Sequence, residues 1–419
     1  MTERLLQYIW QFQYFNPANL CTEEGEALQV ISPGILNTNQ GPDFADAKIR
    51  IDNTTWAGSI ELHINSSDWN HHKHSADKHY RNVILHVVWK NDVNLHQPFS
   101  TLVIGDKVPK VLLNRYDELM HNSRFIACEK NIHLVDSLTW QSWKERILVE
   151  RLEKRTGHIF DLLTKNNNHW EETFWWLLAR NFGSNLNGDA FERTAQSISI
   201  NILAKHKEQI HQAEALLFGQ AGLLNDHFRD DYPKLLQREY QFLQKKYGLQ
   251  QVKAPMIFLR MRPSNFPTVR LAQLAMLVHK SLHLFARIRE SEDMETIRQL
   301  LQVTANDYWH YHYRFDEATA FKKKNLGEQM INSILINTVV PILFAYGHYH
   351  NEDRYKDKAL NWLEGIAAEK NALTKGYTDL GVENKTAFDS QALIQLKQEY
   401  CNKKLCLDCS IGNKILKKQ

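Results

Sequence analysis

A stretch near the N-terminus alternates between apolar and polar residues, and this pattern constrains the fold most strongly. From Asp46 to Asp52 the apolar residues Ala47, Ile49 and Ile51 alternate with polar ones. From Trp56 to Ile64 the alternation resumes, and period-two alternation is typical of half-buried strands. Turn-forming residues at 52–54 join the two segments, so they predict an antiparallel hairpin. The more continuously apolar residues 83–89 predict a third strand inside the same sheet.

The predicted hairpin places acidic side chains on one face of the sheet. Glu61 and His63 are two residues apart on a strand, so both side chains leave the face opposite Trp56, Ile60 and Leu62. With a two-residue loop we expect Asp46 opposite Glu61 and Lys48 opposite Ser59. With a bulge or a longer turn we expect Asp43 to approach Glu61 instead. Two carboxylates one strand spacing apart repel each other until a cation binds, and oxygen ligands suit Mg²⁺ or Mn²⁺.

The motif Pro42-Asp43 followed by Glu61-Leu62-His63 resembles the PD-(D/E)xK nuclease superfamily. The resemblance implies a restriction-endonuclease-like core in which an N-terminal helix and three strands are followed by a helical stretch and a further strand. It also implies an acidic pair that holds the metal ion for phosphodiester hydrolysis. His63 stands where the superfamily has lysine, and Lys48 on the partner strand is a candidate substitute. The candidate catalytic residues are Asp43, Asp46, Lys48, Glu61 and His63.

Several histidines follow the second strand of the hairpin. This cluster consists of His71, His72, His74 and His79 together with Asp77. Imidazoles are good zinc ligands, but the same residues are also typical of a polar segment bonded to backbone or solvent. His72 and His74 are further candidates for binding phosphate beside the hairpin. His86 lies within an apolar strand and is expected to be a core histidine.

The rest of the chain is helical in pattern, which predicts an α+β protein with a large all-α domain. We expect an α/β nuclease-like module over residues 1–130, a helical domain over 131–400 and a basic, cysteine-containing segment over 401–419. Hydrophobic residues make up 43% and charged residues 24% of the chain, as in soluble proteins. We therefore expect a cytoplasmic protein with no membrane partner. The net charge is only +3, so any binding of nucleic acid must use local basic patches.

Two segments of the helical region carry candidate binding residues. Arg260, Arg262 and Arg270 surround a proline-bounded loop that enters a helix, which suits a nucleic-acid phosphate. The alternative is an arginine network that fixes the loop geometry. The aromatic and histidine run from Tyr308 to Tyr313 could stack on bases, or could form a packing seam between helices.

The C-terminal segment has the spacing of a metal knuckle. Cys401, Cys406 and Cys409 form C-x4-C-x2-C, and such thiolates can bind one ion or cluster. A fourth ligand is needed; Cys128, Cys21 or a histidine could supply it. Some PD-(D/E)xK nucleases are similar in placing an iron–sulfur cluster on one distant cysteine and a C-terminal group of three. The expected site is Cys128, Cys401, Cys406 and Cys409, with zinc or an iron–sulfur cluster.

Over nearly its whole length the sequence also resembles a bacterial family known only as a domain of unknown function. The segments that carry this resemblance are GPDF, IELH-x4-DW, LLFGQAGLL, RMRPSNFPTVRLAQLA and YC-x4-C-x2-C. The resemblance implies one full-length architecture and no particular activity. Two functions therefore remain open: a metal-dependent nuclease, or a non-catalytic binding or scaffold protein with a degenerate nuclease-like domain.

Overall fold

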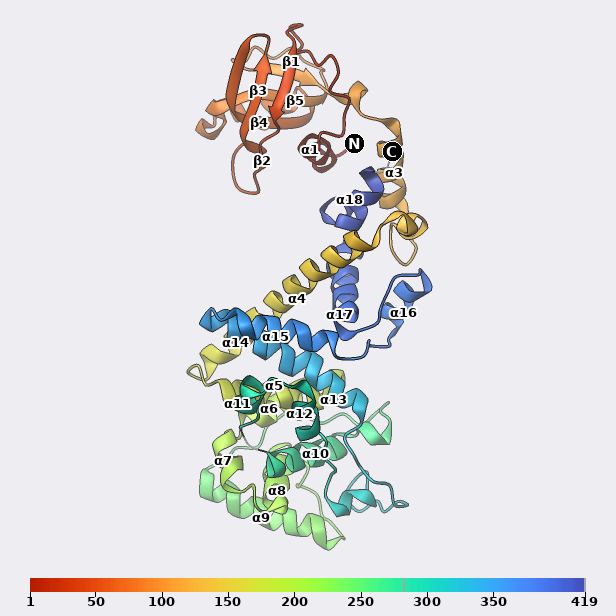
Figure 1. Cartoon of the computed structure of the whole chain (residues 1–419). Coiled ribbons are helices and arrows are strands. Elements are labelled where there is room, and N and C mark those ends of the chain that lie inside the picture. Colours follow the sequence, from red (N-terminus) through yellow and green to blue (C-terminus); the bar gives the residue numbers. More distant parts are fainter. Residues whose placement is uncertain (282, 418–419) are drawn as a thin grey trace. The chain divides into compact units, whose positions relative to one another are not determined.

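The chain folds into two compact units (Figure 1). The computed structural model describes residues 1–281 and 283–417. The first unit consists of Met1–Trp143 and Leu396–Gln419, and the second consists of Lys144–Gln395. The C-terminal segment predicted over residues 401–419 therefore lies in the first unit.

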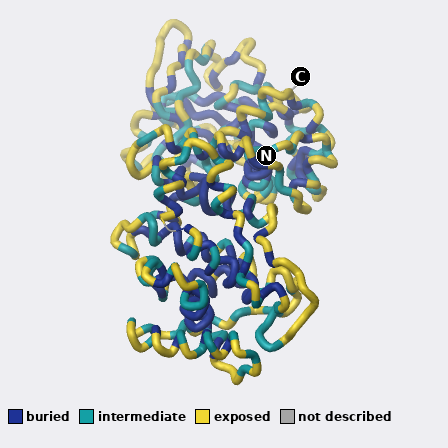
Figure 2. Tube along the Cα trace, turned by 60° about the horizontal axis from the view of Figure 1, so that its bottom comes forward, coloured by how far each residue is buried: buried dark blue, intermediate teal, exposed yellow. Residues whose placement is uncertain are grey.

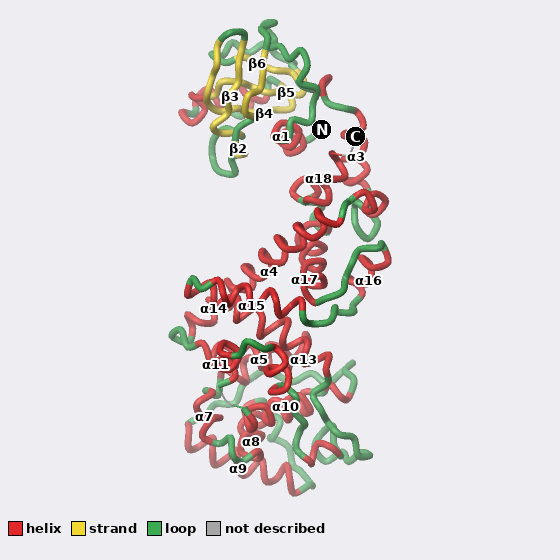
Figure 3. Tube along the Cα trace, in the orientation of Figure 1, coloured by secondary structure: helices red, strands yellow, loops and turns green. Residues whose placement is uncertain are grey.

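The first unit is built on a mixed six-stranded sheet. Its strands are β1 (Leu28–Ser32), β2 (Ile35–Leu36), β3 (Phe44–Ile51), β4 (Thr54–Asn65), β5 (Val83–Lys90) and β6 (Ser100–Val103). The order is β1-β3-β4-β5-β6, with β2 also paired to β3. The pairs β1–β3, β2–β3 and β3–β4 are antiparallel, whereas β4–β5 and β5–β6 are parallel. Within the described residues all named strands lie in this unit, so the predicted α+β class is confirmed (Figure 3).

The hairpin of β3 and β4 has a two-residue loop and a bulge. Ile51 pairs with Thr54, and Lys48 pairs with Ala57, so the register expected for a two-residue loop, with Lys48 opposite Ser59, is wrong. The register then shifts between Phe44 and Ala47, where Asp46 adopts a left-handed φ of 56°. This bulge brings Asp43 toward Glu61, which is the second of the two expected arrangements.

The apolar face of β4 is shorter than predicted. Ile60 and Leu62 are fully buried, but Trp56 is 47% exposed because it lies in the part of β4 that extends past the core. Gly58 leaves no room for a side chain, since a Cβ there would lie 2.6 Å from the carbonyl oxygen of Asn82, directly before β5. The core therefore begins at Gly58 and follows β4 toward Glu61 and His63.

The first unit also contains helices and short turns. Its α-helices are α1 (Glu3–Gln11), α2 (Asp68–His71), α3 (Lys110–His121) and α18 (Ser410–Lys417); α1 and α2 pack on β4, and α18 packs on α3. Thr2 caps α1, because its side chain accepts a hydrogen bond from the Leu5 N–H. The connection from β4 to β5 contains α2 and two 3-10 turns at 74–76 and 78–82. Lys414 forms an ion pair of 2.7 Å with Asp136, which ties α18 to the chain before α4.

The second unit is helical. It contains most of α4 (Ser137–Lys165), and then α5 (Trp170–Phe182), α6 (Ser184–Gln196), α7 (Ile200–Lys205), α8 (Ile210–Gln220), α9 (Asp231–Tyr247), α10 (Pro267–Lys280), α11 (Leu284–Glu290), α12 (Met294–Leu300), α13 (Glu328–Ile334), α14 (Val340–His350), α15 (Asp353–Glu364), α16 (Ala372–Asp379) and α17 (Ala387–Gln395). Each unit has its own buried core of strands or inner helices, and its exposed residues gather in loops and on outer faces (Figure 2).

The most apolar helix of the second unit runs continuously from Glu328 to His350. A π-turn over Leu335–Val339 joins α13 to α14 and accommodates Pro341, which cannot donate a backbone hydrogen bond. In length and composition this is the one helix of the described chain that could span a bilayer, but 72% of its most apolar window is buried inside the protein. It is therefore a core helix of the second unit.

The aromatic run of the second unit surrounds a buried carboxyl group. Trp309 is fully buried and stacks on Phe218 with ring centroids 5.1 Å apart, so this part of the run is a packing seam. Glu214 on α8 is also fully buried, and it accepts hydrogen bonds from the Tyr232 hydroxyl at 2.6 Å and from the Trp309 indole at 3.2 Å. Burial raises the pKa of Glu214 to about 7, despite these two hydrogen bonds.

Glu214 predicts a pH dependence of stability. Because its folded pKa lies above the ordinary 4.5, its contribution is fully present below pH 4.5 and is lost as the pH rises through 7. In urea unfolding, the free energy of unfolding of the wild type should fall by up to about 3 kcal/mol between pH 4.5 and 8 because of Glu214. Glu214→Gln should lack this decrease. Glu208→Gln, a change at a side chain that is 84% exposed, is the control and should leave the pH profile unchanged. Identical profiles for Glu214→Gln and the wild type would contradict the prediction.

Candidate functional site

Asp43 and Glu61 meet at the bulged end of the hairpin. The Asp43 N–H donates to Glu61 Oε2 at 3.0 Å, and the Leu62 N–H donates to Asp43 Oδ2 at 3.0 Å. Gln7 of α1 donates to Asp43 Oδ1 at 2.7 Å, so the N-terminal helix also positions this carboxylate. Glu61 is 5% exposed, whereas Asp43 is half-buried. Two acidic residues distant in sequence are thus held together by backbone and amide donors.

The electrostatics of this pair favour a bound cation. Burial raises the pKa of Glu61, and the nearby Asp43 raises it further. Burial also raises the pKa of Asp43, although the hydrogen bonds from Leu62 and Gln7 act in the opposite direction. Ionising both carboxylates in this buried position costs free energy, because the two negative charges repel each other. A divalent ion would remove that cost, because it stabilises both charged forms.

Histidines complete the site on the same face of the sheet. His63 Nε2 lies 3.6 Å from Glu61 Oε1 and 3.1 Å from His72 Nδ1. His74 Nε2 lies 3.3 Å from the same Glu61 oxygen. His86 on β5 reaches His63 Nδ1 through its Nε2 at 2.8 Å. Ligand atoms of His63, His72 and His74 all lie within 4.8 Å of one another, as a metal-binding group requires.

The connection between β4 and β5 places His72 and His74 over the strand. Asp68 Oδ2 accepts a hydrogen bond from the Asn65 N–H and closes the turn that leads into α2. Lys73 between the two histidines has a left-handed φ of 60°, which reverses the chain so that both side chains can approach His63. Tyr80 stacks on His74 with ring centroids 3.9 Å apart. Local turn chemistry therefore sets the positions of both histidines.

Other sequence candidates lie apart from this group. Lys48 is exposed and pairs with Ala57, four positions along β4 from Glu61, or about 13 Å at the usual rise of a strand. Asp46 is exposed on the bulge. His71, expected in the histidine cluster, has a side chain that is 71% exposed and faces Asp68. His79 contacts Asp77 at 2.7 Å and likewise belongs to the surface.

Sequence reasoning did not anticipate two members of the site. His86 was expected to be a core histidine, and it is fully buried, but it also contacts His63. His86 pairs with Glu61 across the parallel strands β4 and β5, and this pairing is the signal that could have identified it. Gln7 gave no such signal, because a polar residue on an amphipathic helix is ordinarily exposed.

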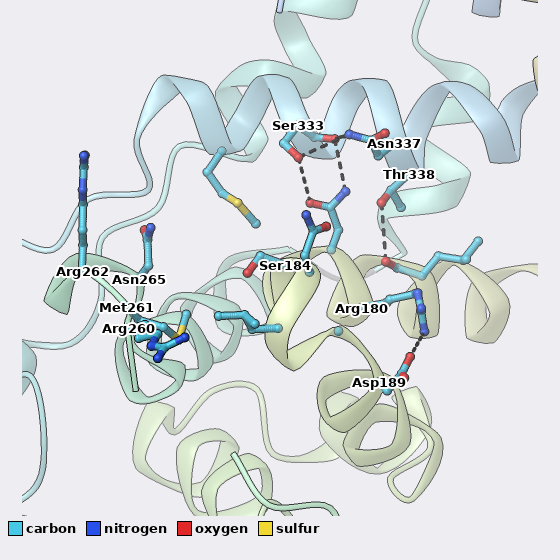
Figure 4. Close-up of a pocket in the computed structure, with 16 residues that line it drawn as sticks. Arg180, Ser184, Asp189, Arg260, Met261, Arg262, Asn265, Ser333, Asn337 and Thr338 are labelled. Carbon is cyan, nitrogen blue, oxygen red and sulfur yellow. Dashed lines mark hydrogen bonds and ion pairs between the residues drawn. The ribbon is translucent and has the colours of Figure 1, made fainter. Parts of the chain in front are cut away.

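The arginine-rich loop of the second unit borders a polar cavity of about 900 Å³ (Figure 4). Arg260 and Arg262 line it, both are exposed, and within the described residues neither guanidinium forms a hydrogen bond or ion pair. Arg270 does not line the cavity. Its guanidinium donates hydrogen bonds to Asn265 Oδ1 at 2.7 Å and to Gln273 Oε1 at 3.0 Å. Arg270 therefore fixes the loop, as the network alternative proposed, while the other two arginines remain available to an anion.

The predicted cysteine ligands all belong to the first unit. Burial raises the pKa of the Cys128 thiol, and the charges of Cys401, Cys409 and Cys406 raise it further, so the four cysteines interact electrostatically. Cys409 directly precedes α18; burial raises the pKa of its thiol, while the backbone N–H groups of Gly412 and Ile411 act in the opposite direction. Cys21 is exposed. Four cysteines are a donor set that structural zinc sites use.

Fold and site together define an α+β protein with a group of carboxylates and histidines on a mixed sheet. The chain belongs to a family whose model is described as "Protein of unknown function (DUF2851)" and matches residues 3–372. This membership is the one expected from the sequence. The three C-terminal cysteines lie outside the matched residues. No curated protein and no solved structure matches the chain.

Proposed function

We propose that the protein binds nucleic acid and hydrolyses phosphodiesters with a divalent metal ion, as a restriction-endonuclease-like enzyme. The observation that carries this proposal is the convergence of Asp43 and Glu61 from neighbouring strands of the bulged hairpin. Mg²⁺ or Mn²⁺ held by these carboxylates would lower the pKa of a bound water and polarise the phosphate. The order of α1, β1, β3, β4, the α2 connection and β5 supports the same assignment.

His63 has a role different from that of the lysine usually found at its position. Burial, followed by the neighbouring imidazoles, lowers the pKa of His63 to about 2, so the ring is neutral at pH 7. A neutral imidazole binds metal ions or accepts a proton, and it does not offer a fixed positive charge. The proposal therefore rests on Asp43, Glu61 and His63, and it gives no role to Asp46 or Lys48.

The second candidate function is a non-catalytic binding protein. The burial of Glu61, which is only 5% exposed, favours this alternative because a substrate phosphate needs access to the ion. The exposed His72 lies at the edge of the group and leaves a direction of approach from the surface. Cleavage of single- and double-stranded DNA and RNA with Mg²⁺ or Mn²⁺, compared with EDTA, decides between the two functions. Binding without cleavage in every case would favour the alternative.

For nucleic-acid binding we propose phosphate contacts from Arg260 and Arg262, with His72 and His74 near the hairpin. Arg262→Ala is expected to weaken DNA or RNA binding about tenfold at low salt and to reduce the salt slope by about 1, because one phosphate contact is lost. Fluorescence anisotropy over a range of salt concentrations measures both quantities. Arg238→Ala, a change at an exposed arginine on α9, is the control. An unchanged salt slope in Arg262→Ala would remove this loop from the interface.

We propose further that Cys128, Cys401, Cys406 and Cys409 hold a structural zinc ion or an iron–sulfur cluster. Thiolates bind such groups after deprotonation; burial raises the pKa of Cys409 to about 12, although the N–H groups of Gly412 and Ile411 favour its charged form. The bound group would connect the segment after α3 to the C-terminal helix within the first unit. Metal analysis and a visible spectrum of the purified protein distinguish zinc from iron–sulfur.

A further inference from the structure

We propose that His63, His72 and His74, which lie beside Glu61, form a site for one nitrogen-preferring transition-metal ion such as Zn²⁺ or Co²⁺. The three histidines bring together imidazole nitrogens, which suit these ions better than Mg²⁺. The inference goes beyond the proposed function, because the site would bind its ion whether or not the protein cleaves phosphodiesters.

The distances fit a tetrahedral site. Metal–ligand bonds of 2.0–2.1 Å place neighbouring ligand atoms of a tetrahedron about 3.4 Å apart. His63 Nε2 lies 3.1 Å from His72 Nδ1. Glu61 Oε1 lies 3.3 Å from His74 Nε2 and 3.6 Å from His63 Nε2. These three distances are close to that length, and the three histidine nitrogens lie within 4.8 Å of one another, a group that does not include Glu61.

Hydrogen bonding alone does not account for this arrangement. His74 Nε2 is buried and forms no hydrogen bond, although Glu61 Oε1 is near it. A buried imidazole nitrogen without a partner loses free energy relative to water, and a metal ion would recover it.

The surroundings orient the ligands as in known metal sites. A ligating histidine usually uses its second nitrogen to bond a neighbour, which fixes its tautomer and ring orientation. His63 does so through Nδ1, which lies 2.8 Å from His86 Nε2. Tyr80 stacks on the His74 ring, and Trp69 packs edge-on against the His63 ring. Glu61 Oε1 faces the histidines, and Glu61 Oε2 accepts the hydrogen bond from the Asp43 N–H. One carboxylate therefore connects the histidine group with Asp43.

Titration of the chelator-treated full chain with Co²⁺ tests the site, because cobalt binding is visible in the absorption spectrum. The wild type is expected to bind one more Co²⁺ per chain than His72→Ala or His74→Ala, or to bind it at least about tenfold more tightly. His71→Ala is the matched control, because His71 lies in the same connection with its side chain 71% exposed. Circular dichroism checks that each variant is folded. Equal Co²⁺ stoichiometry and affinity in all four proteins would overturn the proposal.

The outcome is separable from that of the proposed function. Loss of Co²⁺ binding in His72→Ala, together with a wild type that cleaves no nucleic acid, would support the metal site and reject the nuclease. Mg²⁺-dependent cleavage by a wild type whose Co²⁺ binding does not depend on His72 or His74 would do the reverse.

Discussion

Replacing Glu61 by glutamine is expected to reduce Mg²⁺- or Mn²⁺-dependent cleavage of nucleic acid by about 100-fold or more. Loss of a metal-ligating carboxylate removes several kcal/mol of transition-state stabilisation, and each 1.36 kcal/mol is a factor of ten in rate. Glutamine keeps an oxygen that can accept the hydrogen bond from the Asp43 N–H, so the fold should survive. Initial rates at saturating metal ion, with wild type and variant at equal concentration, measure the effect.

The same substitution has an opposite effect on stability. Because burial and Asp43 raise the pKa of Glu61, its ionised form is unfavourable in the folded protein without metal. Glu61→Gln should therefore melt at the same temperature as the wild type in EDTA, or higher, at pH 8. Glu24→Gln, a change at an exposed carboxylate of the same unit, should leave both activity and melting temperature unchanged. A Glu61→Gln protein that cleaves at the wild-type rate would end the catalytic proposal.

Cys409→Ser is expected to release the metal ion or cluster and to destabilise the first unit by about 3 kcal/mol or more. Structural zinc supplies folding free energy directly, of the order of 10 kcal/mol in isolated zinc-finger peptides. Cys409 is 6% exposed and holds its sulfur against two backbone N–H groups, so serine cannot substitute for it as a soft ligand. Metal content per chain and thermal unfolding followed by circular dichroism report the two losses separately.

Cys21→Ser provides the control, since Cys21 is exposed and forms a β-bridge with Ala27. It should retain both the metal and the wild-type melting temperature. If purified wild-type protein contained neither zinc nor iron, and Cys409→Ser unfolded with the wild type, the four cysteines would be ordinary reduced thiols.

The sheet could be predicted from the sequence, because apolar residues at every second position are typical of a β-strand with one buried face. The alternation of Ala47, Ile49 and Ile51 located β3, and Glu61 with His63 located the functional face of β4. The choice between Asp43 and Asp46 could not be made, because it depends on a bulge at a non-glycine residue with a positive φ. The apolar and polar residues around Asp46 alternate regularly, so the sequence does not show that the strand is bulged there.

Long-range packing accounts for the other differences. The helical pattern of residues 131–400 predicted a helical domain, but it carries no information about which helix faces meet. The spacing of the C-terminal cysteines likewise did not show that Lys414 pairs with Asp136 within the first unit. The histidine group likewise depends on His72, His74 and the strand residue His63 meeting in space, which sequence spacing alone does not encode.

A crystal soaked with Mn²⁺ and measured near the manganese absorption edge tests the central claim most directly. The account predicts an anomalous peak beside Glu61, at roughly 2.1–2.3 Å from a carboxylate oxygen, within reach of Asp43 or the histidines. No peak at this position, with Glu61 still bonded only to the Asp43 N–H, would contradict the account.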